Sequence, residues 1–273
     1  MPILNNLTVN EIGEGGTPNY YAKLAIDQDG VLGHDTTQTT FSTNPATDIN
    51  VTELFAGEHH GFYIYEWDTP WLTTVDCSDL ERVSQSGVFS GCFHNQTLIT
   101  SFDFSNLEVI VDSVFECAFN CDPDKSASCA TFSFPALTDA MGYAFASAWE
   151  YNTGIVTASF PVLETAGEYA FNAAFNNASS LATAYFPALQ EIGEGCFMSA
   201  FTPLGDNDAN LTVTFGGTSE ITLGADCFTD MFAGRYTPTT VYAPAANQAE
   251  IEAMSGYPEF GADTGTVTWH WRS

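Results

Sequence analysis

Residues 160–175 read FPVLETAGEYAFNAAF, and residues 186–201 read FPALQEIGEGCFMSAF. The two stretches carry the same residue at eight of their sixteen positions. Each ends in two aromatic residues four apart, Phe171 and Phe175 in the first copy, a spacing that places both side chains on one face of a helical turn. The run LATAYFP at residues 181–187 is typical of a short strand that Pro ends. One unit is therefore predicted to be a short strand plus a short helix or 3₁₀ segment.

The aromatic pair recurs along the chain. A small residue followed by Phe, with a second aromatic residue four positions later, occurs six times. The first aromatic residues of the copies are Phe89, Phe115, Phe145, Phe171, Phe197 and Phe228. They are 26, 30, 26, 26 and 31 residues apart, so the unit has 26 residues and two copies carry polar insertions, near 121–127 and 203–208, that should be surface loops. A stack of units can bury aromatic residues that one unit cannot, which predicts a repeat solenoid with an aromatic ladder.

The unit resembles the BspA-like leucine-rich repeats. The motif of that family runs approximately L-x-x-I-G-x-x-A-F-x-x-C/A-x-x-L-x-x-I-x-(I/F)-P, and LQEIGEGCFMSAF at residues 189–201 follows it closely, as does the stretch 163–187. The resemblance covers about residues 71–245. It implies a leucine-rich-repeat solenoid, irregular where aromatic residues and Ala replace Leu and Ile and where Glu220 takes an aliphatic position. It also implies that residues 239–261 close the array.

Three regions follow from the extent of the repeats. Residues 1–70 lack the motif, and the alternating stretch FYIYEW at residues 62–67 favours a β-rich N-terminal region that caps the array or attaches it to something. Residues 71–240 hold about six repeat units. Residues 241–273 form the predicted C-terminal cap, which should end in a strand because Val and Trp alternate there with Thr, His and Arg.

The charge of the chain is strongly one-sided. It has 34 acidic residues against five Lys and Arg, a formal net charge of -29. Nucleic-acid affinity comes mainly from Lys and Arg that displace counterions, and anionic membranes attract the same cations. No stretch approaches the length of consecutive apolar residues that a transmembrane helix needs. We therefore expect neither a nucleic-acid partner nor insertion into a membrane.

The seven cysteines leave their oxidation state open. Four of them fall inside the repeated motif, where packing in the core is expected: Cys92, Cys117, Cys196 and Cys227. Cys117, Cys121 and Cys129 cluster around the first insertion, where a disulfide is one alternative and free thiols are the other. A zinc site is disfavoured because the chain has no CxxC pair and no His near this cluster in sequence.

The sequence contains none of the common catalytic motifs. It lacks a phosphate loop, a GxSxG or HExxH stretch and a dinucleotide fingerprint. The stretch DNDAN places Asp206, Asp208 and Asn210 at alternate positions, as oxygen ligands lie in calcium loops, although the later Gly and bidentate Glu are missing. Calcium at these three residues is the one cofactor that the sequence suggests, with a solvated loop as the alternative.

A repeat solenoid of this kind favours a binding or structural protein over an enzyme, because solenoids bind along an extended surface. Tyr and Trp are frequent anchors of interfaces. The candidate contact residues are Tyr63, Tyr65, Trp67, Trp71, Tyr143, Tyr151, Tyr169 and Tyr185. Partly buried packing is the alternative role for each of them.

Two settings fit such a binding protein. In the first it is a bacteriophage virion component, a fibre, spike or decoration subunit, with residues 1–70 as a docking segment through which a homo-oligomer would form. The start, MPILNN, lacks the basic region of a secretory signal peptide, which favours this setting. In the second it is a secreted or surface-displayed bacterial or protist adhesin of the BspA-like kind, binding matrix proteins or other cells. The expected partners are virion proteins, or a protein or glycan of a cell surface, and the expected location is the virion or the outside of a cell.

Overall fold

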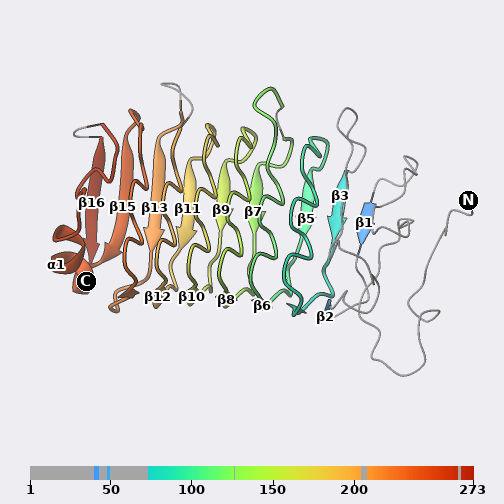
Figure 1. Ribbon diagram of the computed structural model, residues 1–273, viewed down its shortest axis with the longest axis horizontal. Helices are drawn as coiled ribbons and strands as arrows, with labels where there is room; N and C mark the ends of the chain where they lie inside the picture. Colours follow the sequence, from blue (N-terminus) through green and yellow to red (C-terminus); the bar gives the residue numbers. More distant parts are fainter. Residues whose placement is uncertain (1–39, 43–47, 50–72, 126, 204–207, 264–265) are drawn as a thin grey trace, which may run out of the picture.

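The computed structural model describes residues 40–42, 48–49, 73–125, 127–203, 208–263 and 266–273. In this part the chain winds into a β-solenoid whose coils stack along one axis (Figure 1). Each strand pairs in parallel with the matching strand of the neighbouring coil, as Thr157 does with Thr183. The repeat solenoid predicted from the sequence is thereby confirmed.

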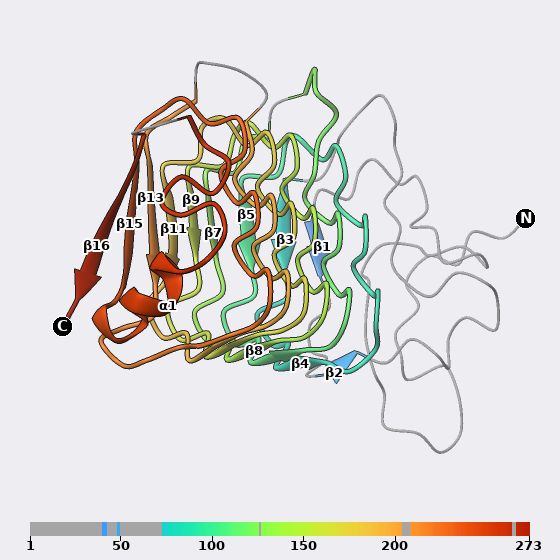
Figure 2. The ribbon, with the colours of Figure 1, turned by 60° about the vertical axis from the view of Figure 1, so that its left-hand side comes forward.

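Most coils contribute one strand to each of two walls. The first wall comprises β1 (Thr40–Ser42), β3 (Thr74–Asp76), β5 (Ser101–Asp103), β7 (Thr131–Ser133), β9 (Thr157–Ser159), β11 (Thr183–Phe186), β13 (Leu211–Phe215), β15 (Thr239–Pro244) and β16 (Val267–Arg272). These strands form a three-stranded sheet, β1 to β5, and a six-stranded sheet, β7 to β16. The second wall, on another side of the solenoid (Figure 2), is a seven-stranded sheet of β2 (Asp48–Ile49), β4 (Arg82–Val83), β6 (Val109–Ile110), β8 (Asp139–Ala140), β10 (Thr165–Ala166), β12 (Glu191–Ile192) and β14 (Thr222–Leu223).

The parallel ladders begin before the predicted first repeat. β1 pairs with β3, with Thr40 opposite Thr74, and β2 pairs with β4, with Asp48 opposite Arg82. These two strands add one more coil to the stack from within residues 1–70. At the other end, β15 and β16 carry the first wall into residues 241–273.

The third side of each coil is a series of turns, so the predicted helix or 3₁₀ segment was wrong. In one coil, Tyr169, Ala173 and Asn177 have positive φ angles of 53°, 50° and 61°. Their N–H groups, and those of Phe171 and Phe175, donate to carbonyl oxygens of the next coil at 2.7–2.9 Å. The residues between them donate to the carbonyl three positions back. An α-helix would bond its N–H groups four residues back within the segment, and a 3₁₀ helix would bond every one of them three residues back, so neither could join neighbouring coils in this way.

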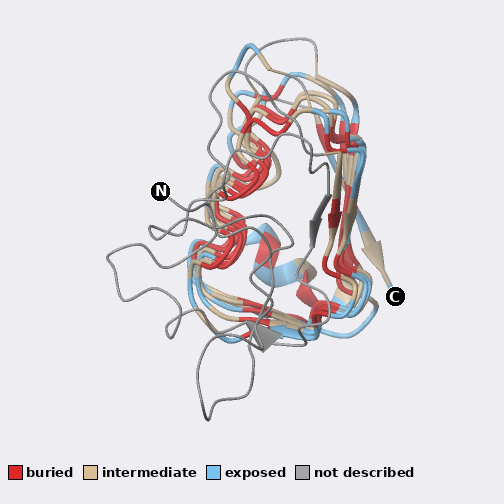
Figure 3. Cartoon of the chain, turned by 90° about the vertical axis from the view of Figure 1, so that its right-hand side faces the viewer, coloured by how far each residue is buried: buried red, intermediate tan, exposed pale blue. Residues whose placement is uncertain are grey.

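Buried residues recur at the same places in successive coils (Figure 3), and the buried aromatic rings among them form three columns. The first stacks Phe89, Phe115, Phe145, Phe171 and Phe197 at 5.2–5.4 Å. The second stacks Phe93, Phe119, Trp149, Phe175 and Phe201 at 5.0–5.7 Å. These two columns are the predicted ladder. A third column, which the sequence analysis missed, packs edge-to-face against the first and comprises Phe104, Phe134, Phe160 and Phe186.

The helices of the described residues lie near the C-terminal end, as η3 (Ala245–Asn247) and α1 (Gln248–Glu252). The Asn247 side chain is buried there and pairs with the backbone of Ile221. Its Nδ2 donates to the Ile221 carbonyl at 2.7 Å, and its Oδ1 accepts from the Ile221 N–H at 2.8 Å. The amide side chain thus satisfies backbone groups that a further coil would otherwise bond.

Glycine allows the coils to approach closely at one corner. A Cβ atom on Gly193 would lie 2.5 Å from the carbonyl carbon of Gly167, and one on Gly224 would lie 2.5 Å from that of Gly193. We expect Gly193→Ala to lower the free energy of unfolding by about 1–3 kcal/mol, because overpacking forces the two backbones apart. Gly217→Ala is the matched control, since the nearest atom to its Cβ is the Pro187 oxygen at 3.6 Å. Chemical denaturation measures both variants, and equal stabilities would contradict the close approach.

Candidate binding surface

The outward face of the first wall carries two straight ranks of side chains. Alternate residues of a strand point to opposite faces, and the middle residues of the triplets, such as Ala158 and Ala184, are buried. The register aligns one threonine from each strand of the six-stranded sheet. This threonine rank consists of Thr131, Thr157, Thr183, Thr212, Thr240 and Thr268. All six are half-buried or exposed, so a line of hydroxyl and methyl groups faces solvent.

A second rank lies two residues further along each strand. It consists of Ser133, Ser159, Tyr185, Thr214, Tyr242 and His270, and we call it the aromatic rank. Tyr185 is 40% exposed. The rings of Tyr242 and His270 stack with their centroids 5.1 Å apart. Thr214, which lies between Tyr185 and Tyr242 in the register, is buried. Ring-bearing side chains therefore dominate the half of this rank nearest the C-terminus.

The two ranks hold no Asp, Glu, Lys or Arg. Their positions are occupied by Thr, Ser, Tyr and His in a chain whose formal net charge is -29. Acidic residues return in the neighbouring three-stranded sheet, where Asp76 lies opposite Asp103 at the position of the aromatic rank. Within the six-stranded sheet the two ranks are thus free of Asp, Glu, Lys and Arg, and a charged residue, Arg272, follows only at the end of β16.

The predicted contact residues that the structure describes fall on two sides of the solenoid. Tyr185 lies in the aromatic rank. Tyr143 and Tyr169 lie on the third side, where their rings stack at 5.1 Å and Tyr143 is 43% exposed. The Tyr169 ring covers Gly195 of the next coil, since a Cβ atom there would lie 2.2 Å from the ring. Tyr151 is half-buried, in the turn series of its own coil. The structure therefore brings Tyr143 and Tyr169 together and places Tyr185 on a different wall.

The remaining predicted contact residues, Tyr63, Tyr65, Trp67 and Trp71, lie outside the described residues, so their role stays a prediction. Sequence reasoning missed the threonine rank, Tyr242 and His270. A signal was present, because the triplets TFS, TAS, TAY, TVT and TVY recur once per unit. Their first and third residues are the members of the two ranks.

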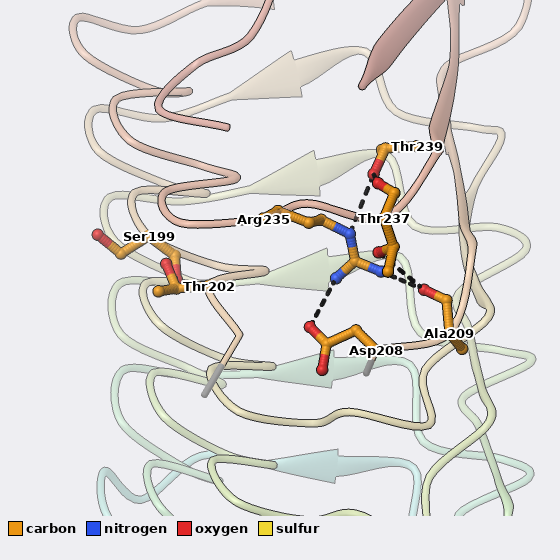
Figure 4. Close-up of polar contacts among 7 residues, drawn as sticks. All are labelled: Ser199, Thr202, Asp208, Ala209, Arg235, Thr237 and Thr239. Atoms are coloured by element: carbon orange, nitrogen blue, oxygen red, sulfur yellow. Dashed lines mark hydrogen bonds and ion pairs between the residues drawn. The ribbon is translucent and has the colours of Figure 1, made fainter. Parts of the chain in front are cut away.

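The loop predicted to hold calcium is only partly described. Asp206 lies outside the described residues, and Asn210 is exposed. Asp208 contacts a cation of the chain itself, because one of its carboxylate oxygens lies 3.6 Å from an Arg235 guanidinium nitrogen (Figure 4). In the part of the chain that the structure describes, no group of three or more His, Cys, Asp and Glu side chains is placed to hold a metal ion. Calcium binding at this loop stays a prediction.

Arg235 joins neighbouring coils at the C-terminal end of the stack. Its Nε donates to the Thr239 hydroxyl at 3.0 Å, and one of its terminal nitrogens donates to the Ala209 carbonyl oxygen (Figure 4). The Thr237 hydroxyl donates to the same carbonyl at 3.3 Å. Burial lowers the pKa of Arg235 and raises the pKa of Asp208, while the attraction between the two opposes both shifts. This arrangement ties the end of the second insertion to the last repeat.

The seven cysteines are all free thiols in the structure, so the disulfide alternative is not realised there. Burial raises the pKa of Cys117 to about 11 and the pKa values of Cys121 and Cys227 to about 12. The thiolate is the nucleophilic form of cysteine. These side chains therefore act as packing residues at neutral pH.

We expect these thiols to be protected in the native protein. At pH 8, iodoacetamide should alkylate Cys117, Cys121 and Cys227 at least about 100-fold more slowly than in the unfolded chain, whose thiols titrate near about pH 8.5. Mass spectrometry of the alkylated peptides measures the rates, and equal rates in the two states would contradict the burial. When the protein is unfolded without reductant, all seven cysteines should be alkylated. A smaller number of alkylated cysteines would reveal a disulfide.

No family model matches the chain, and no curated protein matches it either. Among the described residues, no helix has the length and apolar character needed to cross a bilayer. The interpretation of the two ranks therefore rests on their own geometry.

Proposed function

We propose that the protein is a non-catalytic binding protein that contacts its partner through the threonine and aromatic ranks. The observation that carries this proposal is the register, which lines up outward side chains from six strands in two straight rows on one sheet. Hydrogen bonds between the strands hold both rows in place before any partner arrives. Such preorganisation reduces the entropy cost of binding, and extended surfaces of this kind are what solenoid proteins use for recognition.

We further propose that the solenoid is of the leucine-rich-repeat type. The Leu residues eight positions before the first aromatic residue, Leu107, Leu137, Leu163 and Leu189, are all buried, as that motif implies. The turn series on the third side is a departure from the short helix or 3₁₀ segment of the proposed type. The buried Leu positions and the 26-residue unit support the assignment.

Two settings are proposed for this binding function. In one the protein is a bacteriophage virion component, a fibre, spike or decoration subunit. In the other it is a surface-displayed or secreted adhesin. The regular, outward-facing ranks support display toward a partner in either setting. Immunogold microscopy distinguishes them, because labelled phage particles would support the first and labelled intact cells the second.

A pair of charge variants tests the binding surface. Thr183→Glu with Thr240→Glu adds charge to the threonine rank, and should weaken binding of the labelled protein to cells and immobilised matrix proteins at least about 10-fold, because an unpaired charge in a contact is costly. Thr165→Glu with Thr222→Glu places the same charges on the second wall and should bind as the unaltered protein does. Equal binding by the two double variants would contradict the proposal.

A further inference from the structure

We propose that the ligand of the two ranks is a neutral, extended polysaccharide, whose sugar rings pack on the aromatic rank while its hydroxyl groups bond to the threonine rank. This inference rests on the proposed binding function and specifies the chemistry of the partner. Three properties of the surface carry it, namely its lack of charge, its periodicity and the placement of its rings.

Charge restricts the class of ligand. A cationic partner would be drawn to the acidic parts of the chain, such as Asp139 and Glu191 on the second wall or Asp76 and Asp103 on the first, in preference to the uncharged ranks. An anionic partner would be repelled by a molecule whose formal net charge is -29. A neutral ligand escapes both effects, and the two ranks offer it rows of side chains without Asp, Glu, Lys or Arg.

The regular spacing of the threonine rank restricts the class of ligand further. Neighbouring strands are about 4.7–4.9 Å apart, so the threonine rank repeats a hydroxyl at that interval across six strands. A ligand that engages the whole rank must repeat along its own length. An extended β-linked polysaccharide advances by a similar distance per sugar and presents hydroxyl groups at each unit. A Thr hydroxyl can both donate to and accept from such groups.

The rings fit the same ligand. Tyr185 and Tyr242 lie two strands apart, roughly 9.5 Å from the strand spacing, with the buried Thr214 between them. This span is comparable to two sugars of an extended chain, so the two tyrosines can meet equivalent units. The C–H face of a sugar is apolar and packs on an aromatic ring, while the phenol hydroxyl reaches its polar edge. His270, stacked on Tyr242, continues the rank by one more strand.

Insoluble polysaccharides provide the test. The protein is mixed with microcrystalline cellulose and with chitin as neutral probes, and with calcium-free alginate resin as an anionic probe. We expect retention on at least one neutral probe, none on alginate, and no loss of retention at high salt, because ion pairs are screened by salt and none is involved. Retention on neither neutral probe, or retention that salt abolishes, would overturn the inference.

Ring variants locate the contact. Tyr185→Ala and Tyr242→Ala should each weaken retention about 10-fold, which corresponds to about 1.4 kcal/mol. Tyr185→Phe should retain most of the binding because it keeps the ring. Tyr143→Ala and Tyr169→Ala remove a stacked pair from the third side and are matched controls, expected to be retained in full. Thermal unfolding checks that each variant folds. An equal loss from Tyr143→Ala and Tyr185→Ala would contradict a site on the ranks.

Failure of this inference can be told apart from failure of the proposed function. If neither neutral probe retains the protein but the Thr183→Glu, Thr240→Glu variant still loses binding to cells or matrix proteins, the ranks bind a protein and only the polysaccharide is excluded. If light scattering shows a dimer that Tyr185→Ala dissociates, a second copy covers the ranks and the polysaccharide inference is overturned.

Discussion

Phe171→Ala is expected to lower the free energy of unfolding by about 3–5 kcal/mol, because truncating a packed aromatic residue loses its transfer energy and leaves a cavity. Phe171 is completely buried. Its ring stacks at 5.2 Å on both Phe145 and Phe197, and meets Phe160 and Phe186 edge-to-face at 5.1 Å. Aromatic pairs of this kind contribute about 0.5–1.5 kcal/mol each beyond the buried area. Chemical denaturation followed by circular dichroism measures the loss.

The position of Phe171 adds a second expectation. Each coil of a solenoid contacts only its neighbours, so a weakened central coil should divide unfolding into two transitions. Phe171→Leu keeps much of the volume and should cost clearly less. Val162→Ala, at a 38% exposed position of the same coil, should change stability by less than about 0.5 kcal/mol. A single transition for Phe171→Ala with a loss below about 1 kcal/mol would show that the columns do not hold the stack together.

Arg235→Met is expected to cost about 3–5 kcal/mol, because it leaves Asp208 buried without a counterion. The Arg235 and Asp208 side chains are 5% and 4% exposed. The substitution also removes the charged donor to the Ala209 carbonyl and the donor to Thr239. Arg235→Lys should recover little, since one ammonium group cannot reproduce the fixed fork of the guanidinium. Denaturant titration at neutral pH measures both variants.

The loss of unfolding free energy in Arg235→Met should depend on pH, because the protonation of Asp208 changes with pH. Burial raises the pKa of Asp208 in the native state, and Arg235 is what lowers it. Without Arg235 the native carboxyl holds its proton more strongly than the unfolded one, which titrates near about 3.9. The contribution of Asp208 to the stability of the variant is therefore fully present below about pH 4 and is lost as pH rises through the raised pKa. Adding Asp208→Asn should restore much of the stability at neutral pH, and an unchanged loss in the double variant would contradict a buried ion pair.

The solenoid could be predicted because its signal is a residue type at a fixed interval. Phe145 and Phe171 each follow a small residue, and 26 residues separate them, so a stack with one coil per unit follows directly. The third column carries the same interval, from Phe160 to Phe186. It was missed because a Phe at the end of a strand can face either side, and only the coil geometry turns it inward.

The turns of the third side could not be predicted from residue identity. Tyr169 and Ala173 adopt the positive φ angles that Gly and Asn usually take, and nothing in the sequence marks them. The spacing of Phe171 and Phe175 fits a helical turn equally well. What selects the turns is the set of hydrogen bonds to the next coil, which is a tertiary property.

The candidate surface could be predicted in part. The sequence predicts Tyr185 as a candidate contact residue, which stays a prediction, and its alignment with Thr214 and Tyr242 depends on strand register. A shift of one residue would turn the ranks inward and the buried residues outward. The sequence alone does not fix that register across six strands, because the insertions near 121–127 and 203–208 change the length of two coils.

The hydrogen bonds between coils determine how the molecule should respond to mechanical tension. They run along the solenoid axis, from the Phe145 N–H to the Ala170 carbonyl and from the Phe171 N–H to the Cys196 carbonyl. A force that pulls the two ends apart along this axis loads the outermost coils first and peels them off in succession. Each 26-residue coil then lengthens the tether by roughly 90 Å, at about 3.6 Å per extended residue. An attachment built from such coils would yield in steps, dissipating work at each one, instead of rupturing at a single load.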